Sequence, residues 1–215
     1  MRNLLIKEIK LASNILSFLF IAFVFMTLIP GYPILMGSFF VCLGIFQSFQ
    51  GLRENSDILY TVLLPVDKAD AVRAKYIFVC FIELMAWLLM AALTALRMTV
   101  LRDAAAYASN PMMNANLVYL GFAALVFALF NAVFLGGFFR TAYRIGKPFV
   151  WFIVLSMLLI LAAEILHHIP GLEVLNSADR LGPQTVILVV SLAVYGAATA
   201  GSCARSMRDF EKIDL

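Results

Sequence analysis

Long apolar stretches separated by short charged segments dominate the pattern of this chain. No Lys, Arg, Asp or Glu occurs in residues 11–52, 104–139 or 181–204. About 20 consecutive apolar residues cross a bilayer as a helix, so the first stretch is long enough for two crossings and the second for one. The pattern predicts an all-α integral membrane protein, a single domain over 1–215, with transmembrane helices at 11–29, 32–49, 76–96, 117–139, 148–166 and 185–203.

The segments around these six predicted spans carry their own signals. Pro30-Gly31-Tyr32-Pro33 combines prolines, which remove backbone donors, with a glycine that permits positive φ, so we expect a tight hairpin between the first two spans. Residues 1–10 place apolar and charged side chains on opposite sides of a helix, which is typical of an amphipathic helix in the membrane interface. For residues 167–184 two conformations stay open, a surface loop or a short re-entrant helix.

Composition supports the membrane assignment, and the basic residues orient the chain. Hydrophobic residues make up 63% of the sequence and charged residues 13%, whereas soluble domains are about half apolar and about a quarter charged. Thirteen Lys and Arg flank one side of the predicted membrane, against Arg97, Arg102 and Arg180 on the other. The positive-inside rule therefore predicts cytoplasmic termini, and we expect a bacterial plasma membrane. The net charge of +3 reflects this orientation and gives no support to nucleic-acid binding.

The predicted cytoplasmic loop at 51–75 combines charges with an apolar helical face. At helical spacing, one arc of about 120° contains Val66, Ala69, Val72 and Tyr76. The opposite arc contains Asp67, Lys68, Asp70 and Lys75. Pro65 divides the loop into two short helical pieces, and the second runs into the third span. Membrane topology requires neither the acids nor this amphipathic pattern, so the loop is predicted to dock onto a partner.

This loop resembles that of the membrane subunits of bacterial type-2 ABC exporters. The similarity lies in Leu64-Pro65-Val66-Asp67-Lys68 followed by Ala71-Val72-Arg73-Ala74-Lys75-Tyr76. The basic N-terminal segment, the tight first hairpin and the six predicted spans extend it over nearly the whole chain. The resemblance implies that the loop forms a coupling helix, which sits in a groove of a separate ATPase subunit.

The same resemblance assigns roles to residues of the loop and to partners. We expect lipid phosphates to anchor the loop at Arg73 and Lys75. The expected ATPase-docking residues are Glu54, Asp57, Pro65, Asp67 and Lys68. Because six spans form half of the family's translocation unit, a second copy of the permease is expected as a homodimer partner. The apolar spans favour a membrane-active substrate, such as an amphipathic or antimicrobial peptide or a lipid-like compound.

A nucleotide site of the phosphate-loop type is missing from the sequence. The pattern G-x-x-x-x-G-K-[ST] does not occur, since Gly146-Lys147 is followed by Pro148 and lacks the upstream glycine. We therefore expect no catalytic residue, cofactor or metal in this chain, and we place ATP and Mg on the partner ATPase.

Two polar residues inside the predicted spans are candidates for the transport path or a gate. Glu83 lies about two turns into the third span, where a charge is costly unless it faces protein, water or a cation. Asn131 lies within the fourth span, and interhelical hydrogen bonding accounts for such a residue as well. For Glu83 both interpretations stay open, a path residue or a hydrogen-bonded packing residue.

Two competing functions follow from other features. Glu164, His167 and His168 share a helical face at i, i+3 and i+4, which would suit a metal-dependent intramembrane hydrolase or protease. They lie where the fifth span leaves the membrane, however, and interfacial anchoring is the favoured interpretation. The third possibility is a non-enzymatic membrane sensor or assembly factor, in which the charged loop docks a signalling protein.

Overall fold

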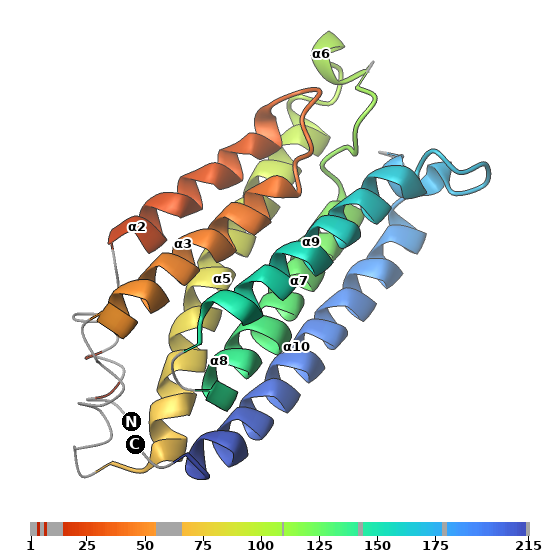
Figure 1. The fold of residues 1–215 in the computed structure, drawn as a ribbon. Helices are drawn as coiled ribbons and strands as arrows, with labels where there is room; N and C mark the ends of the chain where they lie inside the picture. The colour runs from red at the N-terminus through yellow and green to blue at the C-terminus, as the bar shows by residue number, and fades with distance from the viewer. Residues whose placement is uncertain are drawn as a thin grey trace.

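Helices make up all of the secondary structure in the described part of the chain (Figure 1). The computed structural model describes residues 4, 7, 15–54, 66–108, 110–141, 144–177 and 180–213. Its elements are α2 (Ile15–Leu19), the 3₁₀ segment η2 (Phe20–Leu28), α3 (Met36–Glu54), α5 (Lys68–Thr99), α6 (Ala105–Ala108), α7 (Leu117–Leu129), the π-helical segment η3 (Phe130–Leu135), α8 (Gly136–Thr141), α9 (Gly146–Leu166), the 3₁₀ turn η4 (Glu173–Asn176) and α10 (Leu181–Glu211).

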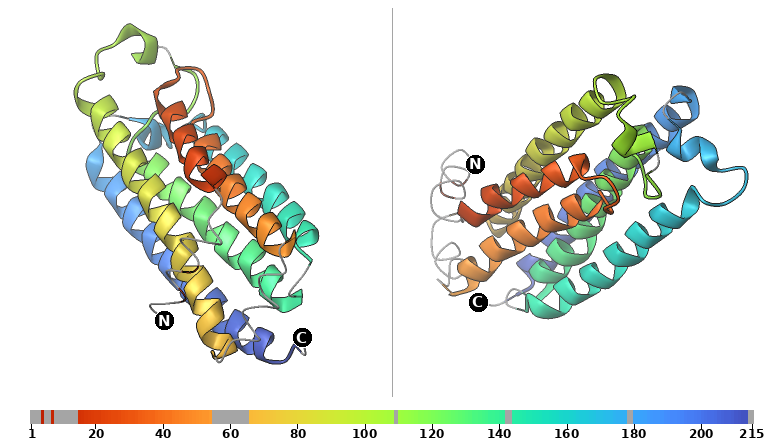
Figure 2. Two further views of the ribbon diagram at one scale, coloured as in Figure 1. Left: turned by 90° about the vertical axis from the view of Figure 1, so that its left-hand side faces the viewer. Right: turned by 90° about the horizontal axis from the view of Figure 1, so that it is seen from above.

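Among the described residues, four helices are long and apolar enough to cross a membrane. They are α5 with 32 residues, the continuous α7–η3–α8 unit with 25, α9 with 21 and α10 with 31. These four correspond to the predicted spans at 76–96, 117–139, 148–166 and 185–203. The segments α2–η2 and α3 run beside them along the same long axis (Figure 1) (Figure 2). A multi-pass membrane protein is thus supported, and six crossings stay a prediction.

The first two helical segments form a hairpin, as the sequence predicts. Gly31 adopts a φ of 71° in the connecting turn, which only glycine adopts readily. Ser17 donates a hydrogen bond to the Gly44 carbonyl over 2.7 Å, and a Cβ at Gly44 would overlap the Phe20 side chain. Small residues therefore let the two segments approach closely, as is common between helices in membranes.

Phenylalanine rings fill the centre of the bundle between α3, η3–α8 and α9. Phe46 stacks on Phe149 with ring centroids 3.7 Å apart, and Phe49 contacts Phe134 edge-on at 5.2 Å. Phe39 stacks on Phe152 at 5.9 Å. Each of these rings is buried, and offset or edge-on aromatic pairs add packing energy beyond the area that they bury. This cluster fixes α3 against η3–α8 and α9.

Two helices extend well beyond their predicted spans. The helix α5 begins at Lys68 rather than Tyr76, and α10 continues to Glu211 rather than Cys203. The 32 residues of α5 correspond to about 48 Å, compared with roughly 30 Å of hydrocarbon. Apolar runs end at the membrane boundary, whereas helices continue through good helix formers such as Ala, Arg, Lys and Met.

Both extensions lie at the same end of the bundle, which we call the basic end. Here α3, α8 and α10 end and α5 and α9 begin (Figure 1). Its basic residues are Arg53, Lys68, Arg73, Arg140, Arg144, Lys147, Arg205, Arg208 and Lys212. The opposite end carries Arg97, Arg102 and Arg180, so the charge asymmetry predicted from the sequence is present in the fold.

Candidate functional site

A buried polar cluster lies in the middle of the bundle, where α5, η3 and α10 meet. Asn131 donates to the Glu83 carboxylate over 2.9 Å and lies 3.1 Å from the Thr199 hydroxyl. Tyr195 donates to the same Glu83 oxygen over 2.8 Å. Glu83 is only 1% exposed. The two path candidates predicted from the sequence, Glu83 and Asn131, are therefore in direct contact.

The polar contacts continue from this cluster towards the basic end. Ser202 donates to the backbone carbonyl of Asn131 over 2.8 Å. The Tyr76 hydroxyl lies 2.8 Å from the Ser202 hydroxyl and 2.9 Å from that of Ser206. We call the full set the polar column: Tyr76, Glu83, Asn131, Tyr195, Thr199, Ser202 and Ser206. It connects the start of α5 with the interior of the predicted membrane region.

The π-helical turn contains Asn131, which binds Glu83 through its side chain and Ser202 through its backbone carbonyl. In η3 the Asn131 carbonyl accepts the N–H of Gly136, one residue further along than in an α-helix. This wider turn leaves the same carbonyl available to Ser202. Single π-helical turns of this kind occur frequently at functional sites.

An apolar cavity of about 310 Å³ opens beside Glu83 between α5, α7 and α10. Its walls include Trp87, Phe127 and Leu192, and its rim includes Leu84, whose side chain is 54% exposed. The second carboxylate oxygen of Glu83 is buried and accepts no hydrogen bond from the described residues. The cavity thus combines a few polar side chains, Glu83 and Tyr195 among them, with apolar walls, an arrangement common to ligand pockets.

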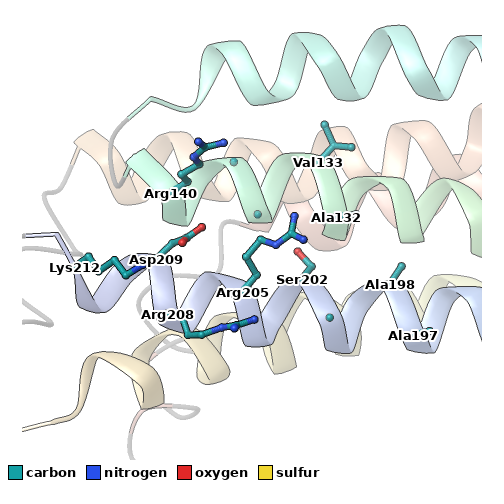
Figure 3. Close-up of a pocket in the computed structure, with 13 residues that line it drawn as sticks. Ala132, Val133, Arg140, Ala197, Ala198, Ser202, Arg205, Arg208, Asp209 and Lys212 are labelled. Carbon is teal, nitrogen blue, oxygen red and sulfur yellow. The ribbon is translucent and has the colours of Figure 1, made fainter.

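A larger groove of about 930 Å³ lies at the basic end between η3–α8 and α10 (Figure 3). Small residues line its inner part, and basic side chains surround its outer part. Arg205 extends from α10 into the space below α8, with Arg140 on the opposite wall (Figure 3). Ser202 lines this groove as well, so the groove and the polar column share a residue.

Comparison with known proteins decides the family. The model of the ABC-2 family of transporter proteins matches residues 3–211, nearly the whole chain. The chain belongs to this family. It is the membrane permease subunit of an ABC transporter, as the resemblance of its charged loop predicts. No curated protein and no solved structure matches the chain.

The predicted docking residues of the permease lie in different surroundings. Glu54 and Asp67 are exposed at the basic end, at the last residue of α3 and directly before α5. Lys68 donates to the Ile213 carbonyl over 2.7 Å, which ties the start of α5 to the segment after α10. Asp57 and Pro65 lie outside the described residues, as does the rest of the loop segment 55–65. The predicted interfacial helix at 1–10 lies almost wholly outside them too.

The two predicted lipid anchors differ in their exposure. Arg73 is exposed and forms an ion pair with Asp70 over 3.3 Å. Lys75 is 3% exposed, because α5 has already entered the bundle at this position. Contact of Arg73 and Lys75 with lipid phosphates stays a prediction.

The acidic and histidine residues at the end of α9 hold a loop in place. Glu164 accepts the backbone N–H of Met113 over 2.8 Å, and the His167 ring lies 3.4 Å from the Pro111 carbonyl. Within the described residues, no group of three or more His, Cys, Asp or Glu side chains is arranged to hold a metal ion. Glu164, His167 and His168 therefore give no support to a metal-dependent hydrolase. The segment at 167–184 forms turns and the short η4.

Hydropathy and charge do not point to four further residues of the polar column, Tyr195, Thr199, Ser202 and Ser206. They recur on α10 at intervals of three and four residues, which places them on one helical face. A stripe of hydroxyl-bearing residues along an otherwise apolar span is a signal of interhelical hydrogen bonding. That spacing would have pointed to the partner elements of Glu83 and Asn131.

Proposed function

We propose that the permease works in an ATP-driven exporter, in which a separate ATPase subunit docks at the basic end. On this account the basic end is cytoplasmic, as the positive-inside rule favours, and the membrane is a bacterial plasma membrane. Two copies of the permease form the translocation unit. ATP and Mg are bound by the ATPase, which docks against the region of Glu54, Asp57, Pro65, Asp67 and Lys68.

The observation that carries this proposal is the continuity of α5. The helix begins next to the exposed Asp67, and the same element holds Glu83 in the polar column. The 15 intervening residues correspond to about 22 Å of unbroken helix. Since an α-helix is stiff along its axis, a displacement imposed at Asp67 moves Glu83 relative to Asn131 and Tyr195.

The proposed substrate is a membrane-active molecule, such as an amphipathic or antimicrobial peptide or a lipid-like compound. Support comes from the lateral cavity, because its apolar walls and its exposed rim at Leu84 suit a molecule that enters from the bilayer. Glu83 provides the one carboxylate within it. We place Glu83 and Asn131 on the transport path, with Tyr195 as a further member.

Photocrosslinking of a co-purified complex tests the docking. A photoreactive amino acid at Asp67 is expected to crosslink to the ATPase, whereas the same group at Arg102, on the opposite end of the bundle, is expected not to. A sensor or assembly factor would give crosslinks from Asp67 to a protein without ATPase activity. That outcome, or equal crosslinking from both positions, would contradict the proposal.

A further inference from the structure

The groove between η3–α8 and α10 has an inner part built of small residues. Ala132, Gly136 and Gly137 line one wall, and Ala197, Ala198 and Gly201 line the other. A Cβ placed on Gly201 would meet no atom within 4 Å. Among the described residues, no side chain fills the space next to Gly201, so the α10 wall of the groove leaves an open apolar trough there.

The outer part of the same groove is strongly basic. Arg140 comes from the last turn of α8, and Arg205, Arg208 and Lys212 follow each other at spacings of three and four on α10. Of the described residues that line the groove, Asp209 is the single acid. In the described part of the chain, none of these four cations is within ion-pair distance of Asp209. The groove thus presents a surplus of positive charge to whatever occupies it.

The length of the groove matches one leaflet of a bilayer. Its residues on α10 extend from Ala197 to Lys212, which corresponds to about 22 Å of helix. Half of a bilayer with its headgroups measures roughly 20–22 Å. With α10 crossing the membrane, the apolar trough lies at the depth of the acyl chains and the cations lie at the depth of the lipid headgroups.

We propose that this groove binds one anionic phospholipid of the leaflet at the basic end. The phosphate and headgroup contact Arg140 and Arg205. The side chains of Arg208 and Lys212 lie at the rim of the groove. An acyl chain occupies the trough along Ala198 and Gly201. A second copy of this chain would bring the same positive charges face to face, so charge complementarity favours the lipid. A soluble anion would leave the apolar trough unfilled.

Native mass spectrometry of the permease released from nanodiscs tests this site. Phosphatidylglycerol is expected to stay bound and phosphatidylcholine to dissociate. The double variant Arg140→Gln/Arg205→Gln is expected to bind phosphatidylglycerol about 30-fold more weakly, because it loses two basic contacts to the anionic headgroup. Its control, Arg102→Gln/Arg180→Gln, removes the same charge at the opposite end and is expected to bind normally. Equal losses in both variants would overturn the proposal.

A second pair of variants tests the trough without changing charge. Gly201→Leu fills the groove, and Gly196→Leu introduces the same side chain on α10 outside it, where a Cβ likewise meets no atom within 4 Å. Only Gly201→Leu is expected to weaken phosphatidylglycerol binding. A change of oligomeric state in Gly201→Leu alone would identify the groove as an interface between copies. Displacement of the lipid by glycerol phosphate would identify a soluble-anion site, and either result would contradict the proposal.

Discussion

At the residue scale, some buried polar groups in this permease bind specific partners across helices. Glu83 accepts hydrogen bonds from Asn131 and Tyr195, and Arg97, 6% exposed, donates to the Thr27 carbonyl over 2.8 Å. Losing one partner of a buried hydrogen bond costs about 1–3 kcal/mol. Stability is therefore sensitive to the shape and hydrogen-bonding capacity of these side chains.

Replacing Glu83 separates its hydrogen-bonding role from its carboxylate. Glu83→Leu leaves the Asn131 amide and the Tyr195 hydroxyl without their acceptor, and we expect a loss of about 1–3 kcal/mol, measured as a lower Tm in detergent. Glu83→Gln keeps an acceptor oxygen and is expected to retain most of the stability. Equal Tm values for Glu83→Leu and the unmodified permease would show that these bonds do not stabilise it.

Arg97 gives a second prediction, at the opposite end of the bundle. Its guanidinium lies 4.0 Å from the centroid of the Tyr107 ring and also donates a hydrogen bond to the Thr27 carbonyl. Arg97→Met removes both contacts, and a decrease of about 2 kcal/mol in the free energy of unfolding is expected. The exposed Arg180 serves as the control, since Arg180→Met is expected to change the free energy by less than about 0.5 kcal/mol. Similar losses in both variants would count against the buried contacts.

At the element scale, small residues decide how closely helices pack. A Cβ on Gly44 would overlap Phe20 of η2, whereas a Cβ on Gly51, on the same helix α3, meets no atom within 4 Å. Similarly, a Cβ on Gly121 of α7 would lie 3.0 Å from the Ser191 hydroxyl of α10. The hairpin and the α7–α10 contact thus depend on the absence of side chains at single positions.

Alanine substitutions at Gly44 and Gly51 are expected to act in opposite directions. Gly51→Ala is expected to stabilise α3 by up to about 1 kcal/mol through helix propensity. Gly44→Ala forces α3 away from η2, and overpacking of this kind costs about 1–3 kcal/mol. Thermal denaturation of the two variants in the same detergent measures the difference. A Tm for Gly44→Ala at or above that of Gly51→Ala would contradict the observed packing of the hairpin.

The element scale also shows what sequence patterns can and cannot predict. Long apolar runs predict the spans of α5, α7–α8, α9 and α10, because hydrophobic length is a local property. Hydropathy does not locate the helix ends, because α5 and α10 continue beyond the predicted spans to Lys68 and Glu211, through charged residues at the basic end. The burial of Lys75 and the contact between Glu83 and Asn131 depend on which helices are neighbours, and hydropathy does not encode this. The hydroxyl stripe on α10 was the available signal.

At the scale of the whole molecule, one rigid helix joins two regions with different chemistry. The start of α5 lies at the basic end, next to the exposed Asp67, and its middle carries Glu83 beside the lateral cavity. Beside α5, hydrogen bonds from α10 and η3 connect Tyr76 with the Asn131 backbone, and the Asn131 side chain binds Glu83. An ATPase docked at the basic end would therefore act on the cavity through α5, which is the central claim of the proposed function.

ATP hydrolysis by the permease reconstituted with its ATPase subunit tests this claim most directly. We expect the permease alone to hydrolyse no ATP, and the complex to hydrolyse ATP at a rate that an amphipathic peptide stimulates. Glu54→Lys/Asp67→Lys is expected to abolish the stimulation, whereas Arg102→Glu, at the opposite end, retains it. ATP hydrolysis by the permease alone, or stimulation that survives charge reversal at Glu54 and Asp67, would contradict the account.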